Sequence, residues 1–139
     1  MLPLGQAHQF KLKVYTEDTD YGGVVYHANY LKFFERARTE YLCAHSQSLT
    51  TLKDNFELSF VIKSVKIDYL KPARLEQTLI ILTRIVKFGS ASLIFEQIIC
   101  DENLEKSLCK ANVVVVAINA EIKPIKIPTQ IIQELQREC

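Results

Sequence analysis

Two kinds of hydrophobic periodicity divide the chain. Residues 10–15 alternate apolar and polar side chains, which predicts a half-buried strand. Between residues 30 and 44, aromatic and small side chains recur at steps of three and four. That spacing forms one apolar stripe and predicts an amphipathic helix that ends near His45. The stretch between these two elements is short and holds two adjacent glycines, so it is expected to be a loop.

The second half of the chain changes to the period of a strand. Residues 64–69 alternate apolar and polar side chains, and residues 75–88, 91–100 and 107–118 are long apolar runs separated by short polar turns. We expect these segments to pair as an antiparallel meander. The run 107–118 is apolar on both faces, so it needs cover on both, and one helix covers only one of them. The other face, or an exposed edge, predicts self-association. Residues 131–135 predict a short C-terminal helix. The fold class is α+β, mostly strand with one long helix.

Composition narrows the possible functions without choosing one. A chain of 139 residues that is 48% hydrophobic and 24% charged is expected to form one domain, over residues 1–139. The net charge of +1 gives no basic footprint, so a nucleic-acid partner is not expected. No apolar stretch is long enough to span a membrane, and residues 1–9 contain Pro3 and Gly5 and lack an apolar run, so neither a membrane span nor a secretory signal is expected.

The cysteines, histidines and acidic residues do not predict a metal site. The four cysteines include no C-x-x-C pair, so we expect reduced thiols in a cytoplasmic protein. The three histidines form no close pair of the kind that binds zinc. Asp18 and Asp20 resemble the start of an EF-hand loop, but Gly22 and Asn29 stand where that loop needs ligands. We expect neither a metal nor a cofactor.

The candidate chemistry lies where the loop meets the helix. Asp20 precedes two glycines and the helix entrance near His27, so a carboxylate would lie beside the unpaired N–H groups of a helix N-terminus. Acyl transfer needs this combination, a group that attacks or activates water and donors for the developing oxyanion. Taken alone, Asp20 fits a turn or cap residue and His27 a packed or capping one. Glu35 is the rival base, although an exposed ion pair with Lys32 is the simpler reading.

The same residues resemble a known family. The segments Glu17–Asp20, Gly22–Leu31 and Phe34–Glu40 are similar to the hotdog-fold acyl-CoA thioesterases of the 4-hydroxybenzoyl-CoA thioesterase family. Among these, the YbgC-like branch, which is associated with the Tol-Pal envelope system, is the most similar. Weaker matches at Tyr69–Ala73, Phe95–Ile98 and Ile127–Pro128 extend the resemblance over nearly the whole chain.

The resemblance implies a fold, an assembly and a set of roles. It implies an antiparallel sheet of about five strands wrapped around the long helix, and homodimers or homotetramers with active sites at the subunit interface. It implies that Asp20 is the catalytic carboxylate, that the backbone N–H of His27 polarises the thioester carbonyl, and that the His27 side chain supports catalysis. It further implies that acyl-CoA, or an acyl group on acyl carrier protein, is the substrate, and it allows peripheral association with the inner membrane. The residues that would line the substrate site are Gly23, Val24, Tyr26 and Ala28.

Several questions stay open at this stage. Arg84, Lys87 and Ser90 flank a turn where family members contact the nucleotide of CoA, but solvated strand-end residues explain them equally well. The branch commonly has a tyrosine where this chain has Thr16, and a small residue where it has Tyr21, which we expect to narrow the acyl pocket. Two other functions compete: a hydratase or dehydratase on the same fold, and a non-catalytic scaffold that binds acyl carrier protein or a lipid enzyme.

Overall fold

The computed structural model describes residues 7–137, so Pro3, Gly5 and Cys139 lie outside it. In chain order, a first strand and a 3-10 turn precede two helices, and four long strands then lead to a C-terminal helix. The elements are β1 (His8–Lys13), η1 (Thr16–Asp18), α1 (Asn29–His45), α2 (Leu49–Phe56), β2 (Ser59–Tyr69), β3 (Thr78–Phe88), β4 (Ser92–Asp101), β5 (Ser107–Ile118) and α3 (Thr129–Arg137). The predicted α+β class is confirmed.

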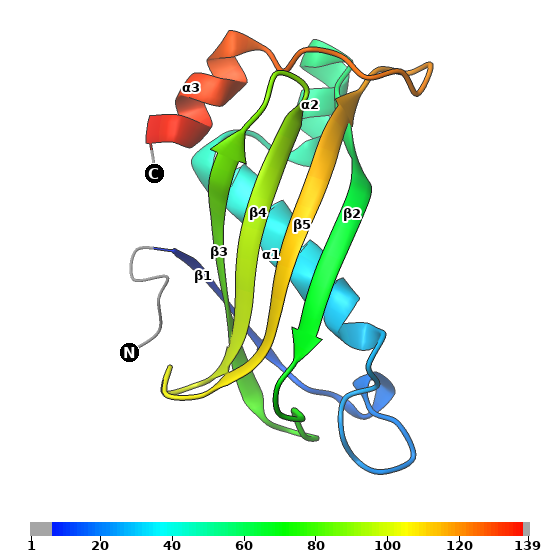
Figure 1. Cartoon of the computed structure of the whole chain (residues 1–139), viewed down its shortest axis with the longest axis vertical. Coiled ribbons are helices and arrows are strands. Elements are labelled where there is room, and N and C mark those ends of the chain that lie inside the picture. Colours follow the sequence, from blue (N-terminus) through cyan, green and yellow to red (C-terminus); the bar gives the residue numbers. More distant parts are fainter. Residues whose placement is uncertain (1–6, 138–139) are drawn as a thin grey trace.

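All five strands form one antiparallel sheet in the order β1-β3-β4-β5-β2 (Figure 1). The predicted meander is confirmed for β3, β4 and β5. It is wrong for β2, which does not pair with β3. Instead β2 pairs with β5, with Tyr69 opposite Cys109. β1 pairs with β3 at the other edge. The strand β2 is thus an edge of the sheet, although the sequence places it next to β3.

The helix α1 lies across one face of the sheet, which curves around it (Figure 1). Its predicted apolar stripe is buried, with Phe33, Phe34 and Ala37 fully inaccessible to solvent. The inward residues of β5 that the sequence assigned to one face, at alternate positions from Cys109 to Ala117, are buried in the same core. Burial of this apolar surface is the main driving force that holds the helix on the sheet.

One polar side chain crosses this apolar interface. Gln97, on β4, is fully buried, and its Nε2 donates to the backbone oxygen of Phe34 on α1 at 2.9 Å and to Oγ1 of Thr83 at 3.0 Å. Its Oε1 accepts a hydrogen bond from Nη1 of Arg38 at 3.0 Å. Because a buried polar group is costly without partners, the two bonds to Phe34 and Arg38 favour one position of α1 along the sheet.

The face of the sheet opposite α1 is also apolar in part. Ile80 and Leu82 on β3 form a separate buried cluster with Ile98 and Cys100 on β4. Burial raises the pKa of the Cys100 thiol to about 11, and the pKa of Cys109, in the main core, to about 12. These two thiols are therefore protonated at neutral pH and poorly reactive. Cys43 is exposed, and the cysteines of the described residues are all free.

The smaller helices close the end of the sheet away from the N-terminal loop (Figure 1). The short C-terminal helix is confirmed as α3, which buries Ile131 and Leu135. The sequence analysis missed α2, whose first turn is capped by Ser48, where Oγ accepts from the N–H of Thr51 at 3.1 Å. Within residues 7–137, no helix is long and apolar enough to cross a membrane.

Substitution of Gln97 by leucine tests the polar contact inside the core. The change keeps the side-chain volume similar but leaves the guanidinium of Arg38 buried without its acceptor, so we expect a loss of about 3 kcal/mol in the free energy of unfolding. Urea unfolding followed by circular dichroism measures it. The control is Glu96→Gln on the same strand, which removes only the exposed ion pair with Arg84 and is expected to cost under about 1 kcal/mol. Similar losses for the two variants would contradict this account.

Candidate active site

The loop between β1 and α1 is folded into a narrow hairpin-like turn. The N–H of Asp20 donates to the oxygen of Val24 at 2.9 Å, and the N–H of Tyr26 donates to the oxygen of Asp18 at 2.9 Å. Gly23 closes the turn with φ of +79°, a conformation that favours glycine because it has no Cβ. The loop lies beyond the end of the sheet at the start of α1 (Figure 1). Gly23 is exposed there, Val24 is half-buried, and both lie within a few residues of the helix entrance.

Asp20 lies exposed at this turn. Its Oδ1 accepts a hydrogen bond from the N–H of Gly22 at 2.8 Å, so the carboxylate does brace the turn, as one interpretation of the sequence expected. Its second oxygen has no hydrogen-bond donor among residues 7–137 and can take part in chemistry. Burial raises the pKa of the nearby Tyr30 hydroxyl, and the negative charge of Asp20 is one of the smaller contributions in the same direction.

Two peptide groups at the helix entrance have their N–H groups turned outward. The oxygen of Tyr26 accepts from the N–H of Asn29 at 2.8 Å, and the oxygen of His27 accepts from the hydroxyl of Tyr69 at 2.9 Å. In a trans peptide the N–H points opposite to the C=O, so the N–H groups of His27 and Ala28 point away from these partners. Neither has an acceptor in the part of the chain that the structure describes. These are the free donors expected at a helix start.

The side chain of His27 is exposed rather than packed into the core. Its ring lies 4.6 Å from the ring of Tyr26 and 6.4 Å from that of Tyr69, measured between centroids. The residue that begins α1 at the cap position is Ala28, and no side chain caps this helix by a hydrogen bond. The interpretation of His27 as a packed or capping residue is therefore wrong, and its imidazole is accessible beside two tyrosines.

Asp18 holds the loop against the helix, a role that the sequence analysis missed. The carboxylate is buried, and its Oδ2 accepts from the N–H of Tyr15 at 2.9 Å. Its Oδ1 accepts from Nδ2 of Asn29, the first residue of α1, at 2.7 Å. The segment Glu17–Asp20 contains three acidic residues, and only the structure distinguishes the buried one from the exposed ones.

Glu35, the rival base, faces a different surface. It lines a cavity of about 260 Å³ between α1 and β2, together with Arg38 and Ile62. The predicted ion pair with Lys32 is not formed, since no ion pair of residues 7–137 involves either side chain. Glu35 lies on the second turn of α1, whereas Asp20 lies in the preceding loop with the free N–H groups. Asp20 and His27 therefore lie on the same loop at the start of α1, and Glu35 lies farther along the helix, in the wall of a different cavity.

The predicted nucleotide contacts lie at the other end of the molecule. Lys87 is next to last in β3 and Ser90 lies in the turn that follows, both are exposed, and this turn is at the end of the sheet opposite the Asp20 loop (Figure 1). Arg84 is engaged by Glu96 on β4 at 2.9 Å. Within one chain these three residues do not join the candidate active site, and Arg84 agrees with the alternative interpretation as a strand-surface residue.

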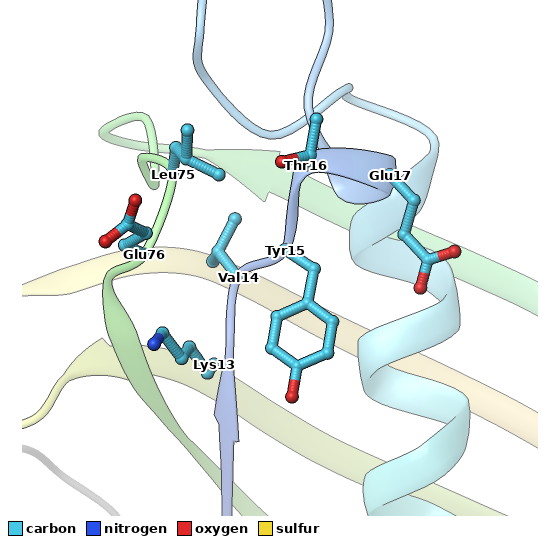
Figure 2. Close-up of a pocket in the computed structure, with 7 residues that line it drawn as sticks. All are labelled: Lys13, Val14, Tyr15, Thr16, Glu17, Leu75 and Glu76. Carbon is cyan, nitrogen blue, oxygen red and sulfur yellow. The ribbon is translucent and has the colours of Figure 1, made fainter.

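The positions where this chain departs from the branch are also exposed. Thr16 lines an open hollow of about 430 Å³ with Tyr15 and Leu75 (Figure 2), and none of the predicted site residues line it. The side chain of Tyr21 is fully exposed. One chain therefore gives no support to the expectation that Tyr21 narrows an acyl pocket.

Comparison with known proteins gives a consistent picture. The profile of the thioesterase superfamily matches residues 22–108. The acyl-CoA thioesterase YbgC of Haemophilus influenzae is 41% identical over 129 residues, which cover 92% of this chain and 93% of the relative. The acyl-CoA thioesterase YbgC of Helicobacter pylori strain 26695 is 45% identical over 94 residues, which cover 67% of this chain and 68% of the relative.

Solved structures agree with the fold. A probable thioesterase from Bartonella henselae superimposes with a TM-score of 0.83 at 40% identity, covering 88% of this chain and 99% of that one. A 1,4-dihydroxy-2-naphthoyl-CoA thioesterase from Synechocystis superimposes with a TM-score of 0.80 at 23% identity, covering 94% of this chain and 93% of that one. The second likeness shows a shared hotdog architecture, which confirms the predicted sheet around a long helix.

The two aspartates of the loop are expected to differ in their effect on stability. In Asp18→Asn, the new NH₂ group would face one of the two buried donors, the N–H of Tyr15 or Nδ2 of Asn29. We therefore expect a loss of about 1–3 kcal/mol in the free energy of unfolding. Asp20→Asn changes an exposed carboxylate and is expected to stay within about 0.5 kcal/mol of the parent. Urea unfolding of both variants measures the difference. An equal loss in both would contradict the assignment of the structural role to Asp18.

Proposed function

Because the chain belongs to the thioesterase superfamily and is a thioester hydrolase, we propose that it hydrolyses acyl-CoA at the loop that joins Asp20 to α1. The observation that carries the proposal is the combination of an exposed carboxylate and two outward N–H groups on one short segment. The names of the YbgC relatives support acyl-CoA as the substrate class. The carrier is proposed to be coenzyme A, with acyl carrier protein as the alternative to compare.

The proposed reaction adds water across the thioester bond. The N–H groups of His27 and Ala28 stabilise the negative charge that develops on the carbonyl oxygen as the carbonyl carbon becomes tetrahedral. The carboxylate of Asp20 either attacks that carbon, so that water later cleaves the mixed anhydride, or removes a proton from the attacking water. In both routes the C–S bond breaks, CoA leaves as a thiolate that takes up a proton, and the acyl group leaves as a free acid. Gly23, Val24 and Tyr26 border the same loop and are proposed to contact the substrate.

A homodimer is proposed to complete this site. The edge strand β2 exposes Ile62, Val65 and Tyr69, and an antiparallel copy of the chain along this edge would cover them. Such a copy has its strands reversed, so its β3–β4 turn lies at the same end as the Asp20 loop. The proposed nucleotide contacts, Lys87 and Ser90, would then come from the second subunit. This arrangement accounts for their distance from Asp20 within one chain.

Substitution of Asp20 by asparagine tests the catalytic proposal. We expect thiol release from a panel of C3 to C16 acyl-CoAs to fall about a hundredfold or more, because the amide neither attacks nor accepts the proton of water. The matched control is Glu17→Gln, an exposed carboxylate of the same loop, which is expected to keep the parent rate. Size-exclusion chromatography confirms that both variants keep the oligomeric state of the parent.

Two results would contradict this proposal. Equal activity of the parent and Asp20→Asn would remove Asp20 from the chemistry. No thiol release by the parent, from acyl-CoA or from acylated carrier protein, would favour a binding scaffold over an acyl-CoA hydrolase. Both measurements use the free thiol of the product, so they depend on no assumption about the natural acyl chain.

Lys87 is expected to affect binding of the nucleotide and not the chemical step. Lys87→Ala removes a cation proposed to contact a CoA phosphate, so KM for acyl-CoA should rise several-fold while kcat stays the same. The same variant should show no change with an acyl-pantetheine thioester, which has the reacting group but lacks the nucleotide phosphates. A similar rise in KM for both substrates would contradict a role in phosphate binding.

A further inference from the structure

Three consecutive peptide groups lead into α1, and the middle one is held differently from its neighbours. The oxygens of Tyr26 and Ala28 accept from backbone N–H groups three residues farther along the chain, at 2.8 Å and 3.3 Å. The oxygen of His27, between them, accepts from no backbone donor among residues 7–137. Its partner in that part of the chain is the hydroxyl of Tyr69, at 2.9 Å, which lies 42 residues away in sequence. A side chain of β2 therefore holds this peptide.

The middle peptide carries one of the two outward donors. Its N–H belongs to Ala28 and points opposite to the carbonyl of His27, because no peptide bond of the described residues is cis. A hydrogen bond that determines the direction of the carbonyl therefore determines the direction of this N–H as well. The N–H of His27 belongs to the preceding peptide, which the backbone orients through the oxygen of Tyr26. Of the two donors, the one on Ala28 depends on Tyr69.

The hydroxyl of Tyr69 is the donor in this contact. A hydroxyl has one proton, and the bond to His27 uses it, so the same group does not donate to a substrate at the same time. Burial raises the pKa of Tyr69, so the hydroxyl keeps its proton and remains a donor at neutral pH. Tyr69 is therefore suited to orient a peptide and not to react itself.

The end of β2 that carries Tyr69 is anchored to the sheet. Tyr69 lies opposite Cys109 on β5. The N–H groups of Leu70 and Lys71 both donate to the oxygen of Leu108, at 2.9 Å and 3.0 Å. The hydroxyl thus reaches the helix entrance from a backbone that is held on the side away from the helix. A rigid support of this kind is what a precisely aimed donor needs.

As a link between β2 and the helix entrance, the Tyr69 hydroxyl is one bond among several. The N–H of Val25 donates to the oxygen of Ala73 at 2.8 Å, and the N–H of Ala73 donates to the hydroxyl of Tyr30 at 3.0 Å. The ring of Tyr69 also packs edge-to-face on that of Tyr30, with centroids 5.5 Å apart. All these contacts would remain without the hydroxyl. What the hydroxyl adds is the direction of the His27 carbonyl.

We propose that Tyr69 is a positioning residue for thioester hydrolysis, which acts through the carbonyl of His27 to hold the N–H of Ala28 toward the developing oxyanion. The inference rests on the proposed function and identifies what holds one of its two oxyanion donors. A donor that is aimed in advance needs no reorganisation when the charge develops. The bond to the carbonyl also polarises the peptide, which makes its N–H a stronger donor.

Tyr69→Phe removes the hydroxyl and keeps the ring. Loss of an oxyanion donor costs about 10²–10³ in kcat, and a misdirected donor should cost less, so we expect kcat for thiol release from acyl-CoA to fall about tenfold. KM should change less than about twofold, because the contact acts in the transition state. The midpoint of urea unfolding should stay at the parent value. The matched control is Tyr15→Phe, the same change in an exposed tyrosine that lines the hollow of Figure 2, and it should keep the parent kcat.

A signal from the peptide itself gives a second readout, independent of activity. The sequence contains one histidine that is followed by alanine, at His27 and Ala28. Protein labelled with ¹³C at the histidine carbonyl and with ¹⁵N at alanine therefore gives one carbonyl-linked amide signal in nuclear magnetic resonance. Tyr69→Phe should shift this signal, because the carbonyl loses its donor and the N–H changes direction. Tyr15→Phe should leave it in place.

The outcomes separate a positioning role from a structural one. Parent kcat in Tyr69→Phe would overturn the proposal, and so would an unshifted signal from the His27 carbonyl. A fall in kcat that comes with an equally clear drop in the urea midpoint would also overturn it, since Tyr69 would then support the fold. Failure of the proposed function has a different signature, because the parent and Asp20→Asn would then release thiol at the same rate.

Discussion

The position of α1 against a single sheet is the constraint on which the rest of the structure depends. The helix α1 supplies a large part of the apolar surface that covers the concave face of the sheet, and Phe33 and Phe34 are completely buried against that face. Burial alone is non-directional and would tolerate sliding. The hydrogen bonds of Gln97 to the Phe34 carbonyl and to Arg38 are directional, so they select one position. The start of the helix, and therefore its free N–H groups, is placed by this contact in the core.

The loop takes its geometry from the helix. Asp18 bonds the side chain of Asn29 and the backbone of Tyr15, so it connects the end of β1 to the first turn of α1. Asp20 then lies one short turn away and is open to solvent, and among residues 7–137 its carboxylate accepts a hydrogen bond only from the N–H of Gly22. The two aspartates therefore differ in their contacts. Asp18 is buried and stabilises the shape of the loop, whereas Asp20 is exposed and its second carboxylate oxygen is free to contact a substrate. A carboxylate with few partners can be replaced without much loss of stability, so the proposed chemistry of Asp20 can be tested apart from folding.

Much of this organisation could be predicted from the sequence. The apolar residues of α1 recur every three or four positions, and those of β5 occupy alternate positions. Both patterns predicted their element well, because each element has one face buried over many residues. The pairing of β2 could not be predicted, since a local pattern does not say which neighbour a strand takes across the sheet. The helix α2 was missed because eight residues give too short a periodic signal.

The geometry around the candidate site could be predicted only in part, for a similar reason. The resemblance pointed to Asp20 and His27, and in the structure both side chains are exposed on the loop before α1, where their catalytic roles stay a prediction. The contact of Tyr69 with the His27 carbonyl joins residues 42 apart in sequence, and no local pattern indicates it. Likewise, neither residue spacing nor composition distinguishes buried Asp18 from exposed Asp20, because both are short acids in a polar loop.

That contact of Tyr69 has a consequence for regulation. The hydroxyl belongs to the last residue of the exposed edge strand, and it orients the peptide whose N–H points toward the proposed oxyanion. Any event that shifts the end of β2 would also tilt that donor. Assembly and transition-state binding would then be thermodynamically linked, so that each favours the other by the same factor. In the proposed homodimer, this one hydrogen bond would couple the activity of one subunit to the presence of its neighbour.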